Sequence, residues 1–280
     1  MDSSGVEVTL RSTPQMPSVA PRMRQMRRES DVMPDSVMQS YLRRVGLPDD
    51  NLTSPVDASL LRRIADAQLA RIPFENLDIH RKRPVEVSVA AIEEKLLGRE
   101  RGGICYELNG LLAHALRTLG FDAQLVGASV VTPNGPGLPL GHVAIVVGFA
   151  GETWLVDVGF GGDAIVHQID AGAVAGWDVR FPSGAAYLTD AAPQPLSDFA
   201  AMAWWHSTSP LARFTSGIVC SLTAGSVRKT LSCKPDEQYQ LAVTDGALRS
   251  ARELDDDEAL AVLAAEFGIR LPELPRPIRF

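Results

Sequence analysis

One cysteine in the sequence stands where a glycine-rich turn becomes a helix. It is Cys105, within the stretch RGGICYELN at residues 101–109. Apolar residues recur after it at three- and four-residue steps up to Gly120, which predicts a helix over residues 105–119 with the cysteine on its first turn. There the unpaired amide donors and the positive end of the helix dipole favour a thiolate. Cys105 is therefore a candidate nucleophile, against the alternative of a small buried apolar side chain, the commonest role of a free cysteine.

A cysteine nucleophile needs a base and a group that orients the base. Two polar residues in the next part of the chain could be this base and its orienting acid. His142 begins a β-rich run at residues 141–147. Asp157 lies inside the apolar run 154–158, where a carboxylate is costly unless another group satisfies it. The remaining histidines show no spacing typical of a metal site, and we expect structural or surface roles for them: His80, His114, His167 and His206.

The connection between these two runs predicts how His142 and Asp157 meet. Residues 149–152 suit a tight hairpin turn, so the runs should pair antiparallel. In the register set by a two-residue turn, Ala144 lies opposite Asp157, and His142 projects from the same face as a diagonal neighbour within side-chain reach. A slip of one residue would separate the two side chains. In this register Cys105, His142 and Asp157 can act as nucleophile, base and orienting acid.

A glycine-rich stretch after the second run offers a competing interpretation. Residues 159–164 (GFGGDA) match the G-x-G-x-x-A pattern of a dinucleotide-binding turn. The β-branched residues that follow do not begin a helix, and no βαβ unit surrounds the match, which argues against that fold. We expect Gly159, Gly161 and Gly162 instead to let an acyl donor approach the backbone.

Composition excludes several classes of function. The chain has 280 residues, of which 45% are hydrophobic and 22% charged, as in ordinary globular proteins. Its net charge of −7 argues against a nucleic-acid binder. Three cysteines without C-x-x-C spacing argue against structural zinc and favour a reducing cytoplasm. No apolar run approaches the roughly 20 residues that cross a bilayer.

Sequence periodicity predicts a helical first part and a β-rich second part. Helices are expected over residues 35–45, from Asp57 to 72, over 88–97 and over 105–119, with an irregular bridge at 72–79. Strands are expected over 123–131, 141–147 and 153–159, with short β segments through 165–190 and 217–232 that residues 204–210 interrupt. A capping box of Asp255 and Glu258 predicts a last helix that ends at Gly268.

Together these motifs resemble the arylamine N-acetyltransferase family. Its Arg-Gly-Gly-x-Cys-x-Glu-x-Asn signature corresponds to residues 101–109 and its Ile-Pro-Phe-Glu-Asn-Leu segment to 72–77. Its histidine strand corresponds to 141–143 and its Val-Asp-Val-Gly-Phe-Gly segment to 156–161. The resemblance covers about residues 35–230 in the right order and spacing, and four linked motifs are far more specific than any one of them.

The resemblance implies an α+β fold with a core like that of cysteine proteases and transglutaminases. A helical domain at 34–120 would carry the nucleophile, and a β-barrel domain at 121–222 would carry the histidine and the aspartate. An α/β lid would occupy 223–280. Residues 1–33, rich in Ser, Pro, Met and Arg, are expected to form a flexible N-terminal extension outside the family pattern.

The resemblance also implies an activity, which is acetyl transfer from acetyl-CoA to aromatic amines, hydrazines or N-hydroxyarylamines in xenobiotic metabolism. It assigns the triad to Cys105, His142 and Asp157, the acceptor pocket to Phe74 and Phe160, and further donor contacts to Ser207 and Thr208. No metal, nucleic acid or membrane is expected, and a homodimer remains open. Two alternatives are a cysteine hydrolase or transglutaminase-like enzyme with the same triad, and a non-catalytic coenzyme-binding module.

Overall fold

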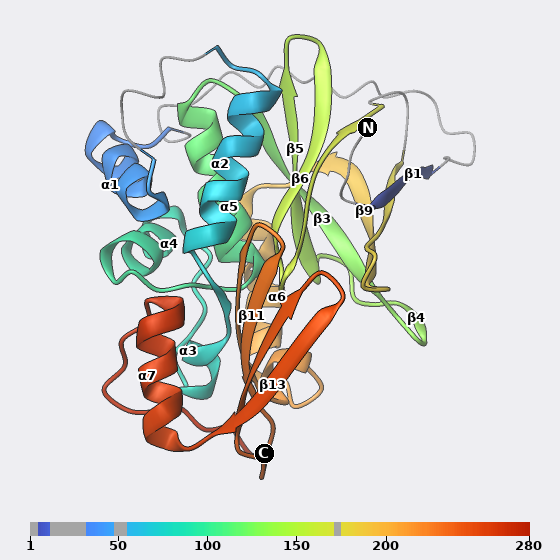
Figure 1. The fold of residues 1–280 in the computed structure, drawn as a ribbon. Helices are drawn as coiled ribbons and strands as arrows, with labels where there is room; N and C mark the ends of the chain where they lie inside the picture. Colours follow the sequence, from blue (N-terminus) through green and yellow to red (C-terminus); the bar gives the residue numbers. More distant parts are fainter. Residues whose placement is uncertain (1–4, 12–31, 48–54, 171–174) are drawn as a thin grey trace.

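The computed structural model describes residues 5–11, 32–47, 55–170 and 175–280. Helices from the first half of the chain lie against one face of a large curved sheet, and a second, smaller sheet lies below them (Figure 1). The helices are α1 (Asp35–Val45), α2 (Ala58–Arg71), α3 (Leu77–His80), α4 (Val89–Glu93) with a π-helical extension (Glu94–Gly98), α5 (Cys105–Thr118), α6 (Ala200–Thr208) and α7 (Asp256–Phe267). The α+β fold class predicted from the sequence is confirmed.

Helix α5 is the central element of the helical layer. Most of its side chains are buried, because it packs against α1, α2 and α4 on one side and against strands of the large sheet on the other. Helix α2 begins at the predicted cap, where the Asp57 carboxylate accepts a 2.8 Å hydrogen bond from the Leu60 amide. The buried Gln68 of α2 donates to the Leu108 carbonyl of α5 over 2.9 Å, so α2 and α5 are joined by a polar bond as well as by apolar packing.

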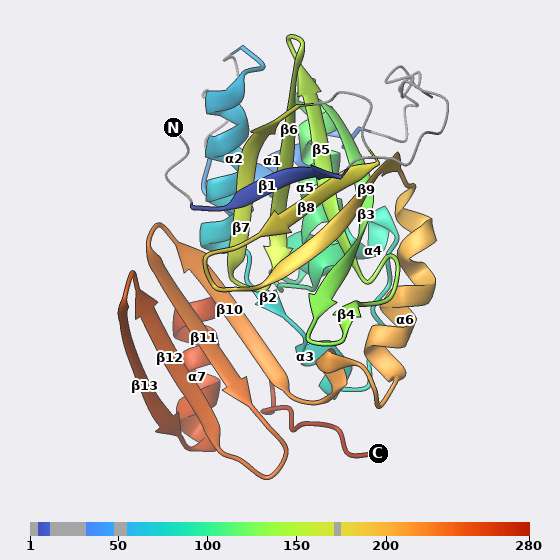
Figure 2. The ribbon, with the colours of Figure 1, turned by 90° about the vertical axis from the view of Figure 1, so that its right-hand side faces the viewer.

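The larger sheet curves into a nearly closed barrel (Figure 2). Its path runs β1-β8-β9-β3-β5-β6-β7, and β4 pairs with β3. The strands are β1 (Glu7–Arg11), β3 (Asp122–Thr132), β4 (Gly135–Pro136), β5 (His142–Phe149), β6 (Glu152–Phe160), β7 (Asp163–Ile169), β8 (Gly176–Arg180) and β9 (Ala186–Pro193). Strands β5 and β6 pair from Ile145↔Val156 to Phe149↔Glu152, which confirms the predicted hairpin register.

The prediction of a flexible extension at 1–33 is wrong for Glu7–Arg11. These residues form β1, an edge strand paired antiparallel with β8. Local composition could not predict this strand, because its partner lies about 170 residues further along the chain and the pairing is tertiary. The remainder of the extension lies mostly outside the described residues.

The smaller sheet has the order β13-β12-β11-β10-β2 and carries α7 on one face (Figure 2). Its strands are β2 (Phe74–Glu75), β10 (Ile218–Ala224), β11 (Val227–Cys233), β12 (Tyr239–Asp245) and β13 (Leu248–Leu254). The expected boundary at residue 222 falls inside β10, so the smaller sheet begins earlier in the chain than predicted. Helix α7 has the predicted capping box, and Gly268 ends it in the left-handed conformation, with φ of 69°.

Several elements differ from the sequence-based expectation. The irregular bridge at 72–79 contains β2, which pairs with β10, and the single turn α3. Residues 204–210 were expected to interrupt the β structure, and they fall largely within α6. This helix has no continuous apolar stripe, since its Trp204 side chain is 66% exposed. Strands β12 and β13 were not predicted; β13 is exposed along almost its whole length and so lacks an alternating pattern. No helix in the described part of the chain is long and apolar enough to span a bilayer.

Candidate active site

Cys105 lies on the first turn of α5, at the predicted place, and the preceding glycines hold that turn against β2. A Cβ atom on Gly102 would lie 2.0 Å from the Pro73 carbonyl oxygen, so only glycine fits there. The Glu75 amide donates to the Gly103 carbonyl over 2.9 Å, and the Ile104 amide donates to the Glu107 carboxylate over 2.9 Å. The start of α5 is therefore fixed from outside the helix as well as by a side chain of its own first turn.

A buried ionic network surrounds this turn, and sequence reasoning missed it. Arg101 donates to Glu75 over 2.7 Å and to Asp78 over 3.1 Å, and Lys95 donates to Glu107 over 2.7 Å. All five side chains are buried. Burial lowers the pKa of Arg101, but Glu75 and Asp78 outweigh it and raise the pKa above its usual value. Because a buried charge without its partner is strongly unfavourable, the network locks the segment that precedes Cys105.

The structure brings the three predicted chemical residues together. His142 at the start of β5 and Asp157 in β6 are joined by a 2.6 Å contact between Nε2 and Oδ2. Cys105, His142 and Asp157 are 2%, 2% and 0% exposed. Since Asp157 engages Nε2, the other ring nitrogen, Nδ1, is left for the Cys105 side chain, whose proximity contributes to the raised pKa of His142. A cysteine triad uses a nucleophile, a base and an acid in this order.

The surroundings of His142 favour its protonated form. Burial lowers the pKa of His142, but the charge and hydrogen bond of Asp157 and the interactions with Cys105 outweigh it and raise the pKa to about 10. At neutral pH the ring is therefore an imidazolium. A cation is thus held beside Cys105, the arrangement that a cysteine nucleophile requires.

Asn109 holds Asp157 in place, a role that the sequence motif contains but that sequence reasoning did not assign. Its side-chain amide donates to Asp157 Oδ1 over 2.8 Å and to the Val143 carbonyl over 2.7 Å. Its oxygen accepts from the Val158 amide over 3.0 Å. Asp157 Oδ1 also accepts from the Gly159 amide over 2.8 Å. One fully buried amide thus connects α5 to both β5 and β6 and orients the acid of the triad.

Gly159 allows β6 to pass directly beside the nucleophile. A Cβ atom at this position would lie 2.8 Å from Cys105 Cα and 2.9 Å from Asn109 Nδ2, closer than real contacts allow. Any side chain here would push β6 away from α5 and separate Asp157 from the helix. Of the three glycines predicted as donor contacts, Gly159 therefore lies at the nucleophile itself.

Aromatic side chains lie close to Cys105 and His142. The Phe160 ring lies 4.9 Å from the His142 ring, between centroids, and Phe74 precedes Glu75 beside the Cys105 turn. Phe214 packs on Phe74 at 5.8 Å. Phe74 and Phe160 thus lie near the triad residues, and Phe214 adds a third ring; the role of Phe74 and Phe160 in an acceptor pocket stays a prediction.

The remaining predicted donor residues lie in two places. Gly161 lies against Phe74, next to Phe160, and both Gly161 and Gly162 have positive φ, 72° and 127°. Ser207 and Thr208 lie on α6, and their hydroxyls donate to helix carbonyls, those of Ala203 and Trp204. In the described part of the chain the structure gives neither hydroxyl a contact with the triad, and their role as donor contacts stays a prediction.

His206 on α6 was predicted to be structural, yet it lies close to the site. Its Nε2 donates to the Gly141 carbonyl over 3.0 Å, directly before His142. Burial lowers the pKa of His206, and the neighbouring His142 lowers it further. A neutral His206 therefore lies beside the cationic His142. The signal that could have identified it is the Trp204–Ser207 cluster of aromatic and polar residues, in which sequence reasoning assigned a function only to Ser207.

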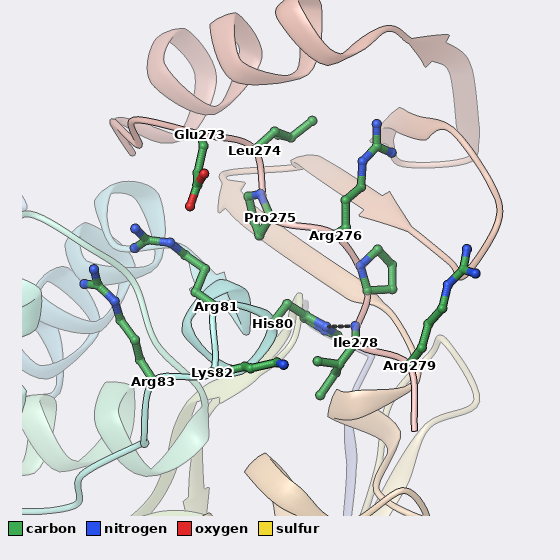
Figure 3. Close-up of a pocket in the computed structure, with 11 residues that line it drawn as sticks. His80, Arg81, Lys82, Arg83, Glu273, Leu274, Pro275, Arg276, Ile278 and Arg279 are labelled. Carbon is green, nitrogen blue, oxygen red and sulfur yellow. Dashed lines mark hydrogen bonds between the residues drawn. The ribbon is translucent and has the colours of Figure 1, made fainter.

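Two other expectations concern sites elsewhere. His80 is buried and accepts at Nδ1 from the Ile278 amide over 3.1 Å, in a structural role. It borders a cavity of about 480 Å³ between the turn after α3 and the C-terminal segment 273–279 (Figure 3), and none of the triad residues lines this cavity. Arg276 and Arg279 on that segment are paired with Asp256 and Asp236, so acids balance much of its positive charge. Within the described residues no cluster of His, Cys, Asp and Glu could hold a metal ion.

Comparisons with known proteins agree with this geometry. A family described as N-acetyltransferase matches residues 57–175 and 166–275. The arylamine N-acetyltransferase of Mycolicibacterium smegmatis is 33% identical over 261 residues, which is 84% of this chain and 92% of the relative. The arylamine N-acetyltransferase / N-hydroxyarylamine O-acetyltransferase of Salmonella typhimurium is 42% identical over 110 residues, 39% of each chain.

Solved structures show the same likeness. The M. smegmatis arylamine N-acetyltransferase structure has a TM-score of 0.73 at 28% identity, with 84% of this chain and 92% of that chain covered. The Mycobacterium marinum arylamine N-acetyltransferase in complex with CoA has a TM-score of 0.71 at 28% identity, with 83% and 92% covered. With its motifs, its fold and these relatives in agreement, the chain belongs to the arylamine N-acetyltransferase family.

Proposed function

We propose that the chain transfers an acetyl group from acetyl-CoA to the nitrogen of aromatic amines, hydrazines or N-hydroxyarylamines through an acetyl-Cys105 intermediate. The observation that carries the proposal is the buried arrangement of Cys105 at a helix N-terminus with His142, whose Nε2 is 2.6 Å from Asp157. Membership of the arylamine N-acetyltransferase family supports the acceptor class. The family relative from M. marinum in complex with CoA supports the donor.

In the first half-reaction the Cys105 thiolate attacks the thioester carbonyl of acetyl-CoA. A carbon–sulfur bond to Cys105 forms, and the negative charge moves to the carbonyl oxygen. The Glu107 amide of the first turn of α5 donates to the Ile104 carbonyl, whereas the amides of Cys105 and Tyr106 precede every acceptor within the helix, so these two can stabilise that charge. The bond to the coenzyme sulfur then breaks. The His142 imidazolium gives its proton to the departing thiolate, and the products are CoA and acetyl-Cys105.

In the second half-reaction a neutral amine attacks the acetyl-Cys105 carbonyl. Acetylation removes the negative charge of Cys105, one of the interactions that raise the pKa of His142, so the imidazole is better able to act as a base. His142 takes one proton from the attacking nitrogen, the carbon–sulfur bond breaks, and the Cys105 thiolate returns beside the imidazolium. Asp157 holds the ring orientation through both steps, because Asn109 and the Gly159 amide fix its Oδ1.

The rings around the triad account for an aromatic acceptor. Phe74, Phe160 and Phe214 present apolar faces and edges on which a flat aromatic amine can pack. An alkylamine of similar size is mostly protonated at neutral pH and must lose a proton and its hydration before it reacts. The apolar lining therefore favours weakly basic aromatic amines and hydrazines.

The three cysteines are free, which supports the cytoplasm as the compartment.

Coenzyme A release in the presence and absence of an amine tests the proposal. Mixed with acetyl-CoA alone, the protein should release about one equivalent of CoA per site and then slow sharply, because acetyl-Cys105 accumulates. Addition of an arylamine should restore steady turnover with parallel double-reciprocal lines, and intact mass should show one acetyl group. Steady release without an amine would favour a hydrolase. Absence of release under both conditions, with Cys105 reduced, would refute acetyl-CoA as donor.

A further inference from the structure

The smaller sheet presents two different faces. Strand β11 alternates between them, so Lys229 points to the face that carries α7, where it pairs with Glu266. Arg228, one residue earlier, points to the opposite face, toward the barrel. The register places Thr223, Arg228, Thr244 and Arg249 opposite one another on neighbouring strands, so they form a single row across this face. We call these four residues the Arg228 row.

The first end of the Arg228 row touches the glycine turn that leads away from the nucleophile. Thr223 Oγ1 donates to the Gly162 carbonyl over 3.3 Å. A Cβ atom on Gly162 would lie 2.6 Å from Arg228 Cδ and 2.8 Å from Arg228 Nη1, so the guanidinium arm lies directly on this glycine. Because Gly159 packs on Cys105 and three residues span at most about 11 Å, the row lies close to the nucleophile.

Carboxylates of the described residues neutralise little of the positive charge of Arg228 and Arg249. Arg228 has one acidic neighbour, Asp163, and their closest atoms are 3.8 Å apart, longer than a hydrogen bond. Asp163 meanwhile accepts a 2.7 Å hydrogen bond from Ser183. The Arg228 side chain is 34% exposed. Arg249 is exposed, and the described part of the chain gives it no ion-pair partner. On a protein with a net charge of −7, two such arginines in one row that begins at the turn beside the nucleophile are a local exception.

From this arrangement we propose that the Arg228 row binds the phosphates of the acyl donor while its thioester lies at Cys105. The inference rests on acetyl-CoA as the donor and names the residues that hold its charged end. Strands two apart in a sheet are about 9.5 Å apart, so the long side chains of Arg228 and Arg249 can reach one diphosphate from two sides. The hydroxyl of Thr244, on the strand between them, adds a neutral donor. The pantetheine arm then spans the glycine turn at Gly161 and Gly162.

Direct binding of coenzyme A tests the proposal without relying on turnover. Titration calorimetry would compare CoA with pantetheine, which has the same thiol arm and no phosphate. The variants are Arg228→Gln, Arg249→Gln and the double variant. Arg252→Gln is the matched control, because it removes the same charge from β13 but on the α7 face, where Arg252 pairs with Glu258 over 3.4 Å.

Each single substitution in the row should weaken CoA about tenfold, and the double variant about a hundredfold, because charged hydrogen bonds to phosphate are lost. Pantetheine affinity should change less than twofold in all variants. Added salt should weaken CoA binding to the unchanged protein more than to the double variant. If the row variants bind CoA as tightly as the Arg252→Gln control does, the Arg228 row does not bind the phosphates. If acetyl-CoA still acetylates Cys105 in that case, the proposed donor stands and only this proposal is overturned. Failure of the unchanged protein to bind CoA would overturn it together with the proposed donor.

Discussion

Replacement of Asn109 by alanine tests how far one buried amide supports the triad. The change removes three hydrogen bonds and leaves the Val143 carbonyl and the Val158 amide without partners in a site that water does not reach. An unsatisfied buried backbone group costs about 1–3 kcal/mol, so these two alone should lower the free energy of unfolding by about 2–6 kcal/mol. Proteins of this kind are stable by about 5–15 kcal/mol, so the variant should fold at reduced temperature.

The chemistry should suffer as well as the stability. Without Asn109, Asp157 keeps only the Gly159 amide on Oδ1 and is held less firmly against His142, so Cys105 should react more slowly with iodoacetamide at pH 7. Asn109→Asp keeps the volume but directs a carboxylate at Asp157, and it should slow the alkylation further.

Urea unfolding and the alkylation rate, both measured at a temperature where all variants are folded, provide the readouts. Asn134→Ala, on an exposed loop where no side-chain bond is lost, is the control and should change stability by no more than about 0.5 kcal/mol. The reasoning is refuted if Asn109→Ala loses less than about 1 kcal/mol and alkylates at the original rate.

Four further outcomes follow from the site. Cys105→Ser should fold normally and lose acetyl transfer, whereas Cys220→Ser and Cys233→Ser should preserve it. Turnover by Cys105→Ser comparable to that of the unchanged protein would refute Cys105 as the nucleophile. Asp157→Asn should slow Cys105 alkylation at neutral pH, because the His142 imidazolium loses its carboxylate partner; an unchanged rate in folded protein would assign Asp157 a structural role only. The raised pKa of His142, about 10, keeps the ring cationic below that pH, and a cation attracts an anionic reagent. The ratio of the Cys105 alkylation rate with anionic iodoacetate to the rate with neutral iodoacetamide should therefore be higher than the same ratio for a free thiol. That ratio should fall as pH rises through about 10 and at a lower pH in Asp157→Asn, and a flat ratio would contradict the ion pair. Gly159→Ala should displace β6 from α5 and reduce activity at least tenfold, since its Cβ would lie 2.8 Å from Cys105 Cα; full activity would show that the strand yields at little cost.

Local sequence was sufficient for the elements that carry the triad. The helix that begins at Cys105 follows from leucine periodicity and flanking glycines, both of which are local properties. The position of Asp157 relative to His142 follows from strand alternation and a short turn, because a hairpin register depends on the turn alone. Asp57 and Asp255 marked two helix starts for the same reason: a capping side chain bonds the backbone only three residues away.

The supports of the triad depend on groups that are far apart in the chain, and only the tertiary structure decided them. Asn109 contacts Asp157 across 48 residues, and Arg101 meets Glu75 across 26, so no local pattern identifies either pairing. Strand β1 and the Arg228 row exist only because distant strands pair, and the exposed β13 has no buried face from which to predict it. The sequence by itself determined the chemical groups and their local elements. Tertiary packing decided which carboxylate each buried cation meets, because burial makes an unpaired polar group costly wherever in the chain its partner lies.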